Sequence, residues 1–78
     1  MKRFRDRSGI EWDVVLGRES WGASVALFVP ATDGDTVVRQ AMLHASAVDS
    51  AFRELDAMGD AELQALLDRS KPKQENDG

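Results

Sequence analysis

The sequence predicts an α+β fold: an antiparallel β-meander of three or four strands, in the order 1-2-3-4, followed by two short helices packed on one face of the sheet. Apolar residues tend to alternate between residues 3 and 43, which is typical of strands. From residue 46 to residue 67 they recur every three or four positions, which is typical of helices. Turn-forming residues separate the alternating segments, so a meander fits the first half of the chain.

The first two strands should form a hairpin. We expect them at residues 2–6 and 10–16, because Asp6 and Gly9 are typical first and last residues of a type I turn. In the second strand the even-numbered residues from 10 to 16 are all apolar and alternate with Glu11, Asp13 and Val15, which indicates one buried face. Trp12 lies on that face and is expected to be part of the core.

The third strand is expected at residues 21–30, where Pro30 ends it because proline has no amide donor. Both faces of this strand are apolar, so it should be central or have a covered outer face. Asp33 and Gly34 form the next hairpin signal. Residues 36–45 should then be the fourth strand, although their alanine, methionine, leucine and glutamine also favour a helix.

Two helices complete the predicted fold. The segment Ser46 to Asp49 resembles a capping box with aspartate in place of glutamate. The apolar face of the first helix consists of Val48, Ala51, Phe52, Leu55 and Met58. Gly59 should end this helix, and Asp60 should cap the second. The second helix is expected to bury Leu63, Leu66 and Leu67.

Strand alternation assigns the two faces of the sheet. The helices should cover the face that carries Phe4, Trp12, Val14, Leu16, Val25 and Leu27. Val15 and Phe28 then point outward and, together with Trp21 at the start of the third strand, form the candidate partner-binding surface. The alternative is that the sheet curls into a small barrel with Phe28 facing inward.

Length and composition indicate a single small domain at residues 1–70, followed by a polar tail at 71–78 that we expect to be disordered. The chain has no cysteine, which excludes disulfides and thiolate metal sites. No apolar run resembles a signal peptide or a membrane span. We therefore expect a cytoplasmic protein without a membrane partner.

No set of residues specifies a reaction. His44 is the only histidine, and Ser46 is better explained as a helix cap than as a nucleophile. Glu11 and Asp13 form a carboxylate pair, but outside any predicted cleft. The acidic turn at 33–35 lacks the further ligands of a calcium loop, and the glycines match no phosphate-binding motif. We expect no enzyme, no catalytic residue, no cofactor and no metal site.

The charge distribution argues against nucleic acid as the main partner. The net charge is −4, and the acidic excess lies in the helical half of the chain. The exception is residues 2–7, where Lys2, Arg3, Arg5 and Arg7 give a local charge of +3. These residues could bind nucleic acid, or they could simply discourage aggregation of an edge strand.

The pattern Phe4-x-Asp6-x-x-Gly9-x-x-Trp12-x-Val14 continues with Ala-Leu-Phe-Val-Pro at residues 26–30 and a leucine-rich, acidic C-terminal helix. This pattern resembles short uncharacterised bacterial proteins and spans most of residues 3–69. The resemblance implies a free-standing small domain and no particular activity.

We therefore expect a non-catalytic interaction or accessory module that binds an unidentified protein partner or forms a homodimer. The alternative is a small nucleic-acid-binding protein that uses the basic N-terminal hairpin. An accessory subunit of a larger enzyme also fits the same sequence features.

Overall fold

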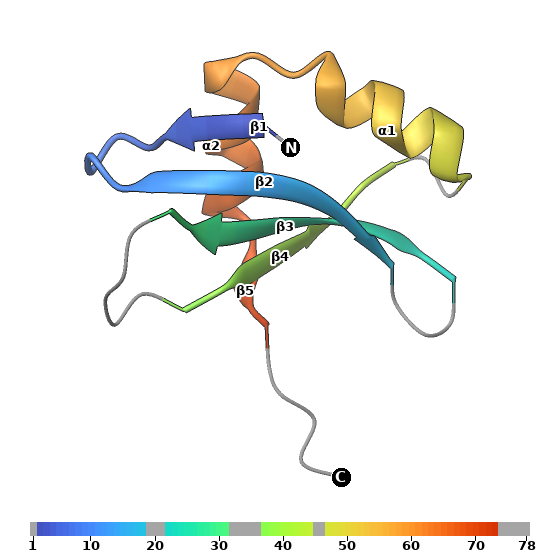
Figure 1. Ribbon diagram of the computed structural model, residues 1–78, viewed down its shortest axis with the longest axis horizontal. Coiled ribbons are helices and arrows are strands. Elements are labelled where there is room, and N and C mark those ends of the chain that lie inside the picture. The colour runs from blue at the N-terminus through green and yellow to red at the C-terminus, as the bar shows by residue number, and fades with distance from the viewer. Residues whose placement is uncertain (1, 19–21, 32–36, 45–46, 74–78) are drawn as a thin grey trace, which may run out of the picture.

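The computed structural model describes residues 2–18, 22–31, 37–44 and 47–73. Its elements are β1 (Lys2–Arg5), β2 (Glu11–Arg18), β3 (Ser24–Pro30), β4 (Arg39–Met42), α1 (Val48–Asp56), α2 (Asp60–Asp68) and β5 (Lys71–Pro72). The strands form one antiparallel sheet in the order β1-β2-β3-β4-β5 (Figure 1). The predicted α+β class is confirmed, and no pairing between β1 and β5 closes the described strands into a barrel.

The strands in the last part of the sheet begin and end at other residues than predicted. Residues 39–42 form a strand, which resolves the choice between strand and helix in this segment. Lys71 and Pro72 pair with β4, and the backbone N–H of Lys73 donates to the carbonyl of Val38 at 2.7 Å. The described sheet thus includes residues 71 and 72, which the sequence analysis assigns to the polar tail. The predicted turn at 33–35 lies outside the described residues.

The core lies between the helices and one face of the sheet. It comprises Phe4, Trp12, Val14, Ala26, Phe28, Ala41, Leu43, Ala51, Leu55, Leu63, Leu66 and Leu67, with Leu16 and Met58 packed against it. Phe28 is fully buried at its centre and meets the rings of Phe4 and Trp12 edge to face, at centroid distances of 6.4 and 6.2 Å.

The two faces of β3 are the reverse of the prediction. Val14 pairs with Phe28, and directly opposed residues in a sheet share a face, so Phe28 faces the helices and Leu27 faces away. The expectations that Val25 and Leu27 face the helices and that Phe28 points outward are therefore wrong. Small residues explain the preference, because alanines at 26 and 41 leave room beneath the helices for one large aromatic ring.

The helices begin at other residues than predicted. The N-cap of α1 is Ala47, without a side-chain cap, and Ser46 lies outside the described residues. The N-cap of α2 is Gly59 rather than Asp60, and its backbone N–H donates to Glu62 Oε1 at 3.1 Å. The leucine stripe of α2 is buried as expected. No helix in the described part of the chain is long and apolar enough to cross a membrane.

Candidate interaction surfaces

The sheet face turned away from the helices has an apolar centre. We call Val15, Leu27, Val29 and Met42 the outer-face patch. Met42 is 44% exposed, whereas the other three are partly buried. Val25 lies on the same face and is almost fully buried. No described element covers this face of the sheet.

Gly17 allows the side chains of the outer face to pack closely. A Cβ atom at Gly17 would lie 2.7 Å from Leu27 Cδ1 and 3.4 Å from Val25 Cγ2. Since 2.7 Å is shorter than a normal contact, Leu27 occupies the space that a side chain at position 17 would need. The apolar patch is therefore continuous from β2 to β3.

Charged residues border the patch on β1 and β2 and neutralise one another. Arg3 Nε donates to Asp13 Oδ1 at 2.6 Å, and Arg5 Nη2 donates to Glu11 Oε2 at 3.0 Å. Arg3 Nη1 also lies 3.4 Å from Glu11 Oε1. The hydrogen bond and negative charge of Asp13 raise the pKa of Arg3 above its ordinary value. Glu11 and Asp13, the carboxylate pair noted in the sequence, thus form surface ion pairs with Arg3 and Arg5.

The other two basic residues of the N-terminal segment contact the helices. Lys2 Nζ donates to the main-chain carbonyl of Asp56 at 2.9 Å. Arg7 Nη2 lies 3.1 Å from Asp68 Oδ2. Lys2 faces the helices while Arg3 and Arg5 face away, since successive residues of a strand point to opposite sides. The four basic residues therefore do not form one cationic surface.

Asp6 organises the turn between β1 and β2. Its Oδ1 accepts from the backbone N–H groups of Ser8 and Ile10, and its Oδ2 accepts from Trp12 Nε1, each at 2.9 Å. Burial alone would raise the pKa of Asp6, but these hydrogen bonds stabilise the carboxylate and the net effect is a lowered pKa. Gly9 completes the turn with a φ of 89°, a conformation that favours glycine.

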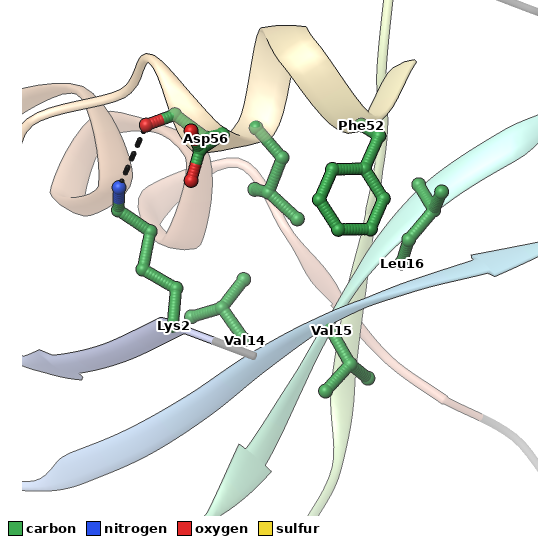
Figure 2. A pocket seen from close by; sticks show the side chains of 7 residues that line it. Lys2, Val14, Val15, Leu16, Phe52 and Asp56 are labelled. Carbon is green, nitrogen blue, oxygen red and sulfur yellow. Dashed lines mark hydrogen bonds between the residues drawn. The ribbon is translucent and has the colours of Figure 1, made fainter. Parts of the chain in front are cut away.

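A groove of about 240 Å³ lies between α1 and β2, at the edge of the sheet. We call it the edge groove. It is lined by Lys2, Val14, Val15, Leu16, Phe52, Leu55 and Asp56. Figure 2 shows the ring of Phe52 beside Leu16, whereas the side chain of Val15 points to the other side of the sheet. Phe52 and Val48 were expected to be buried, but they are 58% and 41% exposed.

The three residues of the predicted partner-binding surface have different positions. Val15 lies in the outer-face patch, Phe28 lies in the core, and Trp21 is outside the described residues. Leu27, Val29 and Met42 were not predicted to lie at a surface. Ala26 is the sequence signal that could have indicated this arrangement. A small side chain lets a helix pack closely on the face of the strand that carries it, so the neighbouring residues of the strand face away from the helix.

The described residues contain no cluster of metal-ligating side chains. His44 is exposed, and its backbone N–H donates to Glu54 Oε2 at 3.1 Å. In the comparisons with known proteins, the chain matches no protein-family model, no curated protein sequence and no solved structure.

Proposed function

We propose that the protein is a non-catalytic interaction module that forms a homodimer through the outer-face patch. The observation that carries the proposal is the apolar centre of this face, which no described element covers and which paired charges border. An apolar centre with a polar rim is the usual anatomy of a protein interface.

The size of the face fits a second copy of this chain. Strands lie about 4.8 Å apart and rise about 3.3 Å per residue, so the face has an area on the order of 500 Å². Two copies would bury on the order of 1,000 Å², which is near the lower limit for a specific interface. A domain with such a small core also gains stability from association.

The charges on the face favour self-association. In an isologous dimer the same surface occurs on both sides, so an unpaired charge would meet its own copy or be buried alone. Arg3, Arg5, Glu11 and Asp13 already balance one another within one chain. Two copies can therefore approach without like-charge repulsion at this edge.

Mass measurement by light scattering tests the proposal. The wild-type chain should have the mass of two chains, whereas Met42→Asp and Leu27→Asp should each give a monomer, because the new carboxylate would be buried in the interface. Phe52→Asp is the matched control, since it makes the same change at an exposed apolar residue on the helix side. Circular dichroism should show all three variants folded. A monomeric wild-type chain at millimolar concentration would refute the proposal.

A further inference from the structure

The edge groove lies beside an open strand edge. β1 pairs with β2 only at residues 11–14, so among the described residues nothing pairs with residues 15–18 on that side. Figure 1 shows β2 continuing past the start of β1, beneath α1. An unpaired strand edge offers backbone donors and acceptors to a further strand.

The direction of the free backbone groups follows from the pairing of β2 with β3. The carbonyl of Glu11 accepts from the N–H of Ala31, so odd-numbered residues of β2 direct their backbone groups toward β3. Leu16 and Arg18 therefore direct their N–H and C=O groups toward the open edge. The side chain of Leu16 lines the groove, so the free backbone groups and the apolar cavity are adjacent.

The polar rim of the groove carries one donor and one acceptor. Lys2 Nζ is held at the carbonyl of Asp56, and the carboxylate of Asp56 lies beside it (Figure 2). An anionic ligand would meet the Asp56 carboxylate, and a cationic ligand would meet Lys2. A neutral group that both accepts and donates a hydrogen bond, such as a peptide bond, suits both residues.

We propose that the edge groove binds an extended peptide, which adds to β2 as an antiparallel strand and places one apolar side chain in the cavity. Main-chain hydrogen bonds to Leu16 and Arg18 would supply affinity, and the pocket would select the side chain. A cavity of about 150 Å³ holds benzene, so this groove of about 240 Å³ has room for a leucine or phenylalanine side chain. The exposed ring of Phe52 forms the wall that such a side chain covers.

The probe is the blocked peptide acetyl-Val-Val-Leu-amide. In the antiparallel register its leucine lies opposite Leu16, on the helix side of the sheet, and its first valine lies opposite Arg18. Titration into the ¹⁵N-labelled full chain should shift the signals of Leu16, Arg18 and Phe52. The peptide should also slow hydrogen exchange at the amide of Leu16. A ligand that contacted side chains alone would not slow this exchange.

Two further peptides are matched controls. Acetyl-Val-Val-Asp-amide places a charge in the apolar cavity, and the N-methyl-leucine form of the probe lacks the N–H that donates to the carbonyl of Leu16. Each should bind about tenfold more weakly or not at all. Equal binding of the N-methylated peptide would mean that no strand is added, and the proposal would be wrong.

Protein variants separate this site from the dimer interface. Phe52→Asp should abolish peptide binding and leave the mass unchanged, whereas Met42→Asp should lower the mass and leave peptide binding intact. No saturable shift with acetyl-Val-Val-Leu-amide would overturn the peptide proposal alone. Octan-1-ol filling the groove while the peptide does not would identify a site for small apolar molecules. A monomeric Phe52→Asp variant would show that the groove holds a second copy instead.

Discussion

At the scale of single residues, Asp6 links the first turn to the core. Its carboxylate accepts two backbone N–H groups of the turn and the indole N–H of Trp12, whose ring packs against Phe28. A hydrogen bond to a charged acceptor contributes about 1.5 to 3 kcal/mol, and an unsatisfied donor left in the core costs a similar amount. The conformation of the turn and the position of Trp12 therefore depend on one ionised side chain.

We predict that Asp6 contributes a pH-dependent part of the free energy of unfolding. The folded-state pKa is lowered from its ordinary value of 3.8, so this contribution is fully present above about pH 4 and is lost as the pH falls through the folded-state pKa. Asp6→Asn should lower the free energy of unfolding by about 1 to 2 kcal/mol at neutral pH. Urea titrations of both proteins should show this difference shrinking as the pH falls below 3.8. A difference that stays constant over this range would contradict the role of the charge.

The sequence predicts only part of this arrangement. Asp6 and Gly9 are recognisable as turn residues because local backbone geometry favours them there. The hydrogen bond from Trp12 Nε1 depends on the register between β1 and β2 and on the orientation of the indole ring. Neither follows from residue types alone.

At the scale of elements, β3 shows why the faces of an apolar strand are difficult to predict. Alternation gives Leu27 and Phe28 opposite faces but does not say which one meets the helices. The choice depends on the pairing of Val14 with Phe28 and on the alanines beneath the helices, which are properties of the assembled sheet. In β2 the acidic residues at 11 and 13 mark the outer face, and the prediction that Trp12 and Val14 are buried is confirmed.

Aspartate substitutions on the two sides of β3 should give opposite results. Phe28→Asp places a charge at the centre of the core, which costs more than the stability of a small domain, so this variant should be unfolded. Leu27→Asp changes the neighbouring residue on the outer face and should remain folded. Far-ultraviolet circular dichroism and thermal unfolding measure both. A folded Phe28→Asp variant together with an unfolded Leu27→Asp variant would mean that the faces of β3 are assigned incorrectly.

The first helix shows a second limit of prediction from periodicity. Its apolar stripe was predicted from spacing, yet only Ala51 and Leu55 are buried while Phe52 remains exposed. Among the described residues, β1 pairs with β2 only as far as Val14, whereas the ring of Phe52 lies beside Leu16, two residues farther along β2 (Figure 2). Phe52 therefore lies at the edge of the described sheet and forms a wall of the edge groove.

At the scale of the whole molecule, the two faces of the sheet differ in their surroundings. The helices bury one face, the outer-face patch lies on the other, and the edge groove opens at the border between them. The basic residues of the N-terminal segment are distributed over these surfaces and are held by Asp13, Glu11, Asp68 and the carbonyl of Asp56. This distribution bears directly on the alternative function in nucleic-acid binding.

We predict weak and salt-sensitive nucleic-acid binding at most. The chain has a net charge of −4, and Arg3, Arg5 and Arg7 would have to leave ion pairs before they could contact phosphates. Few counterions would then be released, so dissociation constants at about 150 mM salt should be no tighter than tens of micromolar. Fluorescence anisotropy with labelled single-stranded and duplex oligonucleotides measures this, with Arg3→Ala as a variant that should change little. Submicromolar binding that Arg3→Ala weakens would instead favour a role of the N-terminal hairpin in nucleic-acid binding.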